Sequence, residues 1–158
     1  MKKLACKILG PIDKVCAAMP EWVLNLSMRI IIFKVFWFSA QTKISGLTLF
    51  GQHFAFWNVT ETTIFLFDFE YGVPLIPADI AAYLGTFGEF FLSLMILFGF
   101  LTRFAALGLV VMTLVIQYVY PDFWWSSHAY WLVILIYLVR HGGGQVSVDR
   151  FLCGKKSP

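Results

Sequence analysis

Two long apolar runs constrain the fold of this chain most strongly. Residues 80–101 contain a single charged residue, Glu89, and residues 104–120 contain none. A helix that crosses the hydrocarbon core of a bilayer needs about 20 mainly apolar residues, with about 17 as the lower end. With 59% hydrophobic and only 13% charged residues, the chain also has too few charges to cover a soluble globule. The sequence therefore indicates a small integral membrane protein.

Two further runs complete a set of four predicted spans. One precedes the central pair and contains Arg29, Lys34 and Lys43, and the other follows it, with His128 near its start. No repeat or linker divides the chain, so we predict one membrane domain over residues 1–158. The predicted fold class is all-α, a bundle of four transmembrane helices with an aromatic-rich outer segment between helices 1 and 2. The helices cover residues 22–45, 79–101, 103–120 and 123–140, and the outer segment covers 46–78.

The positive charges predict the orientation of these spans. Residues 46–78 and 121–127 contain no Lys or Arg. Cytoplasmic loops of membrane proteins carry an excess of these residues, so both termini are predicted to be cytoplasmic. The basic leader is not expected to be a cleaved signal, because no apolar region follows it before Pro11. The positive charges outside the spans are Lys2, Lys3, Lys7, Lys14, Arg103, Arg140, Arg150, Lys155 and Lys156.

The outer segment, residues 46–78, is rich in aromatic residues and contains three acids between residues 61 and 70. Thr60 is predicted to cap a short helix that runs to about Glu70 and is ended by Val73 and Pro74. This mixture of acidic and apolar residues is typical of an amphipathic helix at the outer interface. The alternative is a floppy loop whose aromatic residues form an interfacial belt.

Charges inside the spans are the main functional signal. Each costs at least about 2.5–3.5 kcal/mol on insertion scales unless it is paired or hydrated. We predict that Glu89 pairs with Arg29, which shares its bundle-facing position, and Lys34 is the rival partner. A purely structural ion pair is one interpretation, and a polar pocket for a ligand or protons is the other. The candidate pocket residues are Arg29, Lys34, Gln41, Lys43, Glu89 and Gln117.

The histidines and cysteines predict no metal site. His53 and His141 fall on opposite sides of the membrane in the predicted topology, and the three cysteines (Cys6, Cys16 and Cys153) form no C-x-x-C pair. His128 lies at the outer start of helix 4, where it is either a proton relay between water and the pocket or an interfacial anchor.

Several short motifs, in this order and spacing, resemble the DoxX family of small bacterial membrane proteins over residues 29–149. They are Thr42-Lys43-Ile44-Ser45-Gly46 after Arg29, Glu70-Tyr71-Gly72-Val73-Pro74, Leu97-Phe98-Gly99-Phe100-Leu101-Thr102-Arg103 after Glu89, and the glycine-rich tail that ends at Asp149. Gly143 occupies the position at which the family has proline. The motif residues carried over are Gly46, Glu70, Pro74, Gly99, Arg103, Gly142, Gly144 and Asp149.

The resemblance implies a four-helix bundle in the bacterial inner membrane. The family is named for a subunit of a thiosulfate–quinone oxidoreductase, and other members are associated with oxidative, thiol or electrophile stress beside soluble redox partners. Relatives of this length often accompany small metal-handling secreted peptides. Because a shared fold transfers chemistry poorly, catalysis and oligomeric state stay open.

Three functional hypotheses follow. The first is a membrane subunit of a redox or stress-response system in which Arg29, Lys43 and Glu89 surround a quinone. The second is a non-catalytic membrane anchor for a metal-handling or oxidative-stress complex, and the third is a small transporter. No flavin or haem motif is evident, so quinone is the candidate cofactor. The expected partners are the lipid bilayer and a soluble redox or metal-handling protein, and not nucleic acid.

Overall fold

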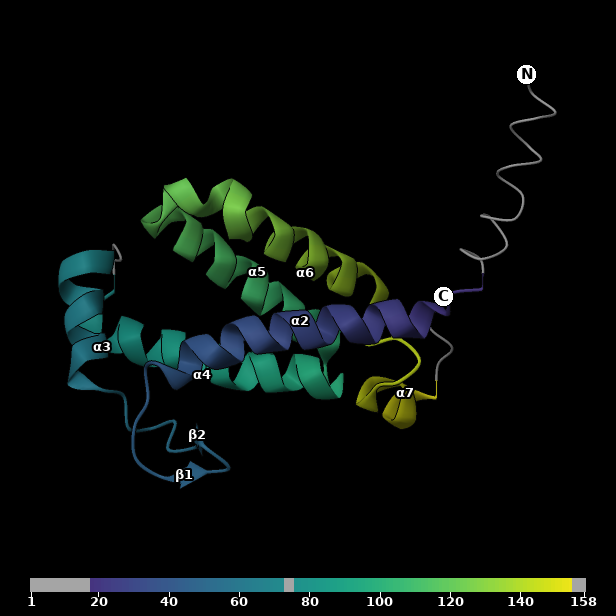
Figure 1. The fold of residues 1–158 in the computed structure, drawn as a ribbon, viewed down its shortest axis with the longest axis horizontal. Coiled ribbons are helices and arrows are strands. Elements are labelled where there is room, and N and C mark those ends of the chain that lie inside the picture. The colour runs from purple at the N-terminus through teal and green to yellow at the C-terminus, as the bar shows by residue number, and fades with distance from the viewer. Residues whose placement is uncertain (1–17, 73–75, 155–158) are drawn as a thin grey trace, which may run out of the picture.

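Three helices in the described residues are long and apolar enough to cross a membrane. The structure is a computed structural model that describes residues 18–72 and 76–154. Figure 1 shows the helices side by side in an elongated bundle, in which α2 packs on α4 and α6, and α5 packs on α4 and α6. The bundle helices are α2 (Glu21–Gln41), α4 (Ala78–Phe98), α5 (Thr102–Val119) and α6 (Ala129–His141).

The fourth expected span, residues 123–140, is helical throughout but only partly α-helical. A 3₁₀ turn (η2, Pro121–Phe123) and a π turn (η3, Trp124–His128) precede α6, which is too short to meet the length of a span by itself. The hydroxyls of Ser126 and Ser127 both donate to the carbonyl of Phe123, at 3.1 and 3.2 Å. Such local side-chain bonds compete with the regular helical ladder, which accounts for the irregular start of α6.

Helix α2 ends at Gln41, before the expected boundary at residue 45. The backbone after it turns away to pair with the outer segment, where Ile44 forms an isolated β-bridge with Val59. The amide of Thr60 also donates to the carbonyl of Lys43 at 3.0 Å. Lys43 therefore lies just beyond the helix, in the connection that leaves the bundle, and not within the span as predicted.

The described part of the outer segment, residues 46–72 and 76–78, covers one end of the bundle (Figure 1). The amide of Thr63 donates to the Thr60 hydroxyl at 3.3 Å, which confirms Thr60 as the helix cap. Gly72, in the left-handed conformation at φ 49°, follows the last turn. Val73 and Pro74, the predicted end of this helix, lie outside the described residues. The elements of the segment are β1 (Thr48–Leu49), β2 (Gln52–His53), α3 (Glu61–Leu66) and the π turn η1 (Phe67–Tyr71).

Contacts between the bundle and the described part of this segment favour the ordered cap over the loop alternative. A Cβ added to Gly85 of α4 would lie 3.1 Å from Cζ of Phe67, so the Phe67 ring packs directly on α4. The ring centroids of Tyr71 and Tyr120 are 5.7 Å apart, and the Tyr120 hydroxyl donates to Glu70 at 2.6 Å. The segment thereby joins the outer ends of α4 and α5.

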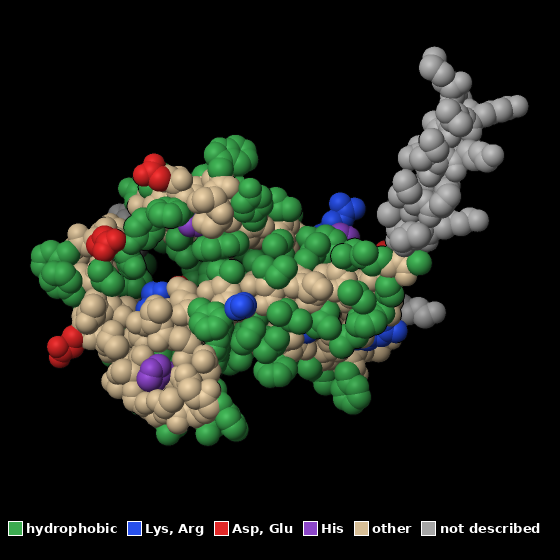
Figure 2. Space-filling model, in the orientation of Figure 1, with side chains coloured by type: hydrophobic (Ala, Val, Ile, Leu, Met, Phe, Trp, Pro, Cys, Tyr) green, Lys and Arg blue, Asp and Glu red, His purple; other side chains and the backbone are tan. Residues whose placement is uncertain are grey.

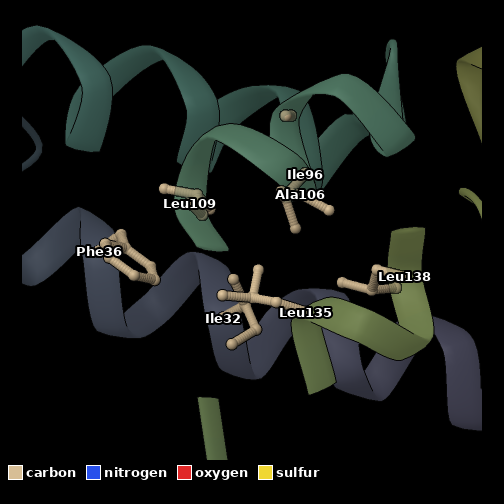
Figure 3. Close-up of a cluster of buried hydrophobic side chains, with 8 residues drawn as sticks. Ile32, Phe36, Ile96, Ala106, Leu109, Leu135 and Leu138 are labelled. Carbon is tan, nitrogen blue, oxygen red and sulfur yellow. The ribbon is translucent and has the colours of Figure 1, made fainter. Parts of the chain in front are cut away.

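Apolar side chains fill the interior and also cover the outside of the bundle. Figure 3 shows the side chains of the apolar core pointing together between all four bundle helices. Exposed apolar side chains are spread over the bundle surface in Figure 2, and an apolar surface of this extent is typical of contact with lipid. The apolar core consists of Ile32, Phe36, Ile96, Ala105, Ala106, Leu109, Leu135 and Leu138.

Candidate functional site

Arg29 is fully buried, and it binds backbone carbonyls instead of Glu89. The predicted pairing of Arg29 with Glu89 is therefore wrong. Ile96 lies seven residues beyond Glu89, about 10 Å farther along α4 at the usual rise per residue. The last carbonyls of a helix have no partner within the helix, and a guanidinium with five donors can satisfy several of them. Arg29 donates to the carbonyls of Ile96 (2.8 Å), Gly143 (2.9 Å), Leu97 and Val146.

Arg29 and the residues around it form a hydrogen-bonded group at this end of the bundle, which we call the inner cluster. Asn25 donates to the carbonyl of Gly142 at 2.9 Å. The Asp149 carboxylate accepts from the amides of Leu101 (2.6 Å) and Thr102 (2.9 Å) at the start of α5, and the Asp149 amide donates to the carbonyl of Gly99. These bonds join the α4–α5 turn to the chain that follows α6.

Two glycines make the close packing of the inner cluster feasible. Gly99 has a φ of +68°, and an added Cβ would lie 2.5 Å from Cβ of Ser147 and 2.7 Å from Nη2 of Arg29. Gly144 has a φ of +70°, and an added Cβ would lie 2.8 Å from Cγ of Asn25. Both the backbone conformation and the space therefore require glycine. The motif residues near the glycine-rich tail thus have a structural role.

Among the other motif residues, those that the structure describes lie at both ends of the bundle. Gly46, with a φ of +101°, packs against Asn58 in the outer segment, and Glu70 accepts the bond from Tyr120. Burial, together with this bond, raises the pKa of Tyr120, so its phenol stays protonated at neutral pH. Arg103 is exposed beside Gly142 at the inner end.

Glu89 pairs with Lys43. Lys43 Nζ lies 2.8 Å from Oε2 and 3.1 Å from Oε1 of Glu89, and the side chains are only 13% and 5% exposed. Ser39, one helical turn before Lys43, donates its hydroxyl to Oε1 of Glu89 at 3.0 Å and accepts from Nζ at 2.7 Å. The three side chains therefore form a closed network that joins α2 to the middle of α4, and neither Arg29 nor Lys34 belongs to it.

This network forms one wall of a cavity of about 400 Å³ between α2, α4 and α5. Cavities that bind small molecules typically measure about 300–1,000 Å³ and place a few polar groups in apolar walls. Figure 2 shows a hollow in this part of the molecule, next to the outer segment. The lining includes Val35, Phe36, Ala81, Leu84, Gly85, Gly108, Val111, Met112, Val115 and Ile116, with Phe67, Tyr71 and Tyr120 at the outer end and Trp131 from α6.

The remaining predicted pocket residues lie elsewhere. Lys34 is exposed on α2, with Nζ 5.8 Å from the centroid of the Phe38 ring. Gln41 binds the hairpin, because it accepts from the amide of His53 at 2.6 Å and donates to the carbonyl of the same residue at 3.1 Å. Of the six predicted pocket residues, all within the described part of the chain, Lys43 and Glu89 are the two that line this cavity.

His128 and Gln117 form a pair outside the cavity lining. Gln117 Oε1 lies 2.6 Å from Nδ1 of His128, whose ring is buried and packs on Trp131 at 5.1 Å between centroids. Because Trp131 lines the cavity, His128 is separated from it by one side chain. A relay role for His128 stays a prediction.

Sequence reasoning missed four side chains that complete the cavity: Ser39, Tyr71, Tyr120 and Trp131. Ser39 carried the clearest signal, since residues four apart face the same side of a helix and Ser39 precedes Lys43 by four. The two tyrosines come together only through the tertiary fold. Within residues 18–72 and 76–154, no three His, Cys, Asp or Glu side chains lie close enough to hold a metal ion.

Comparison with known proteins agrees with the resemblance noted in the sequence. The DoxX family model matches residues 24–122, which is more than half of the chain and includes most of α2 and all of α4 and α5. The glycine-rich tail of the inner cluster lies beyond this match. No curated protein and no solved structure matches the chain significantly. The extent of the family match shows that the chain, a membrane protein by its apolar helices, belongs to the DoxX family.

Proposed function

We propose that the protein is the membrane subunit of a redox or stress-response system, and that it binds a quinone headgroup beside Lys43 and Glu89. The observation that carries this proposal is the placement of a buried ion pair in the wall of an otherwise apolar cavity. Charged side chains within a bilayer cost free energy unless they are paired or hydrated. An ion pair whose role was only to join two helices would be expected to be enclosed by protein and not to line a cavity. A flat ring with carbonyl oxygens and apolar edges matches this combination of walls.

The chemistry of the pair suits a quinone. The Lys43 ammonium can donate to a carbonyl oxygen of the ring, which withdraws electron density and favours reduction. Glu89 can exchange a proton with the oxygen once it is reduced. Two electrons and two protons convert the quinone to a quinol, and the electrons come from a soluble redox partner. In this proposal the chain itself supplies the binding site and the route for protons.

We also propose that the chain is one domain with four spans in the bacterial inner membrane and that both termini are cytoplasmic. The helical stretch from Pro121 to His141 packs along α5 and is long enough to serve as the fourth span. Arg103, Arg140 and Arg150 lie near the end that carries the inner cluster, which suits the cytoplasmic side. The cavity and the outer segment then lie in the periplasmic half.

Extraction of bound quinone tests this proposal. The full chain would be purified in a mild detergent and its lipids analysed for quinone per protein. We expect quinone to copurify with the wild type and to be lost in Lys43→Met. The matched control is Lys34→Met, which removes an exposed lysine from α2, the helix that precedes Lys43, and should retain the quinone. Equal quinone content in all three proteins, or none in the wild type, would contradict the proposal.

The hairpin of the outer segment favours a second function, a non-catalytic anchor for a soluble oxidative-stress or metal-handling partner. Phe50 at its tip is 95% exposed and adopts a φ of +51°, so the turn presents the ring to its surroundings. Exposed aromatic residues are enriched where proteins dock. If this function is correct, a partner captured by the wild type in mild detergent is lost in Phe50→Asp, while the quinone content does not change.

A further inference from the structure

One wall of the cavity beside Lys43 and Glu89 is made of side chains that are also exposed on the surface of the bundle. Leu84 of α4 and Val111 and Val115 of α5 line the cavity, yet they are 59%, 61% and 43% exposed. A side chain can meet both conditions only at an opening. The cavity therefore reaches the bundle surface between α4 and α5.

The packing of α4 on α5 shows how this opening arises. Toward the inner end the helices touch, since a Cβ added to Gly88 would lie 2.4 Å from Cε of Met112, and one added to Gly108 would lie 2.7 Å from Cδ1 of Leu92. One turn farther out, at Gly85, both atoms within 4 Å of an added Cβ belong to Phe67 of the outer segment. Figure 1 shows α4 and α5 diverging toward the end that carries α3.

The aqueous end of the cavity, in contrast, is covered by aromatic side chains. Tyr71 and Tyr120 pack edge to face there, and the bond from Tyr120 to Glu70 holds the two segments together. Phe67 closes the space beside them. A ligand from water would have to displace this group, whereas a ligand in the bilayer meets only the apolar edges of α4 and α5.

We propose that the ligand reaches the cavity sideways from the outer leaflet, through the opening between α4 and α5, and that it is an amphiphile with a hydrocarbon chain. Its oxygen-bearing headgroup lies at Lys43 and Glu89, and its chain lies along Leu84, Val111 and Val115 into the lipid. The headgroup position and the choice of the outer leaflet rest on the proposed function and topology, but the opening between α4 and α5 and the chain do not. A long-chain quinone and a fatty acid share this chemistry.

Photolabelling with two chain-bearing probes tests the route. The full chain would be placed in phosphatidylcholine nanodiscs with a quinone or a palmitate that carries a diazirine on its chain, and the labelled peptides would be identified. We expect labelling concentrated on α4 and α5 around Leu84 and Val111. In Val111→Trp and in Val115→Phe, which narrow the opening at exposed positions, this labelling should fall to the level seen on α6. Val133→Trp, an equally exposed change on α6, should leave it unchanged.

The outcomes separate this inference from the quinone function. Labelling spread evenly over the lipid-facing helices, or unaffected by both narrowing variants, overturns the lateral route. If the lateral route is overturned in this way but a chainless quinone still binds to the wild type and not to Lys43→Met, the proposed quinone function stands without the lateral route. Labelling of the opening by palmitate alone supports the lateral route and contradicts the quinone function.

Discussion

At the scale of single residues, the protein holds Arg29 and Lys43 in different ways. Arg29 is surrounded by backbone carbonyls, which satisfy its charge with fixed dipoles and leave no group free for chemistry. Lys43 is bound by a carboxylate and a hydroxyl at the edge of a cavity, where its donors can be shared with a ligand. This difference indicates a structural role for Arg29, and it supports the ligand-binding role that we propose for Lys43.

A double-mutant cycle measures the Lys43–Glu89 pair. Removing one partner of a buried pair typically costs about 3–5 kcal/mol, because the remaining charge is uncompensated. We expect Lys43→Met and Glu89→Gln each to destabilise the protein toward unfolding in detergent, and the double change to cost less than their sum. The parallel cycle with Arg29→Met should be additive. Coupling of Glu89 to Arg29 instead would refute the assignment.

Replacement of Arg29 by lysine tests the inner cluster. Lysine keeps the charge but has three donors on one atom, so it cannot reach carbonyls on both α4 and the tail. Leaving buried acceptors unsatisfied costs about 1–3 kcal/mol each. Thermal unfolding in detergent should therefore show a clear loss for Arg29→Lys and almost none for Arg103→Lys, an exposed control. Equal stability of the two variants would show that the carbonyl contacts contribute little.

At the scale of elements, the outer segment and the inner cluster close opposite ends of the bundle. The outer segment joins α4 to α5 through Phe67, Tyr71 and Tyr120. The inner cluster joins α2, the α4–α5 turn and the tail through Arg29 and Asp149. Between them α4 and α5 diverge, so the cavity depends on the outer segment for its end wall.

The change Phe67→Asp tests whether the outer segment acts as this wall. A carboxylate at this position would face apolar side chains of η1 and α4, so we expect lower stability and loss of bound quinone. Phe65→Asp is the matched control, since Phe65 lies in the same segment but is exposed and does not line the cavity. If both variants behave like the wild type, the outer segment is not part of the cavity wall.

The elements could be predicted from the sequence better than the site. Apolar runs placed α4 and α5 within a few residues, and Thr60 as a cap depends only on local sequence. The partner of Glu89 depends on where α2 ends, and nothing local shows that Ile44 leaves the helix to pair with Val59. Arg29 could not be assigned because its partners are backbone carbonyls, which leave no trace in the sequence.

At the scale of the whole molecule, charge follows the long axis of the bundle. Figure 2 shows acidic side chains at the end that carries α3, where Glu61, Asp68 and Glu70 lie. Arg140, in the last turn of α6, and Arg150, in the short helix α7 (Val148–Cys153), lie at the other end. The proposed topology, with four spans and both termini in the cytoplasm, agrees with this distribution, because the positive-inside rule assigns the end with Arg140 and Arg150 to the cytoplasmic side.

Thiol labelling of intact cells tests this orientation. In a variant with Cys6→Ser and Cys16→Ser, the exposed Cys153 should react with a membrane-impermeant maleimide only after the cells are permeabilised. In the same background with Cys153→Ser, Thr62→Cys on the exposed side of α3 should react in intact cells. The reverse pattern would invert the topology, and labelling of both sites in intact cells would show an even number of spans between them, which contradicts the four-span topology.

The most direct test of the central claim is a titration of the purified protein with a chainless quinone, followed by tryptophan fluorescence. Because Trp131 lines the cavity, binding there should quench it, and Trp131→Phe should abolish the saturable signal while Trp125→Phe, at an exposed position outside the cavity lining, should retain it. Loss of a hydrogen bond to a charged group is worth about 1.5–3 kcal/mol, so Lys43→Met should raise Kd by about tenfold or more. Saturable quenching that survives Trp131→Phe, or a Kd that Lys43→Met does not change, would contradict a quinone site beside Lys43 and Glu89.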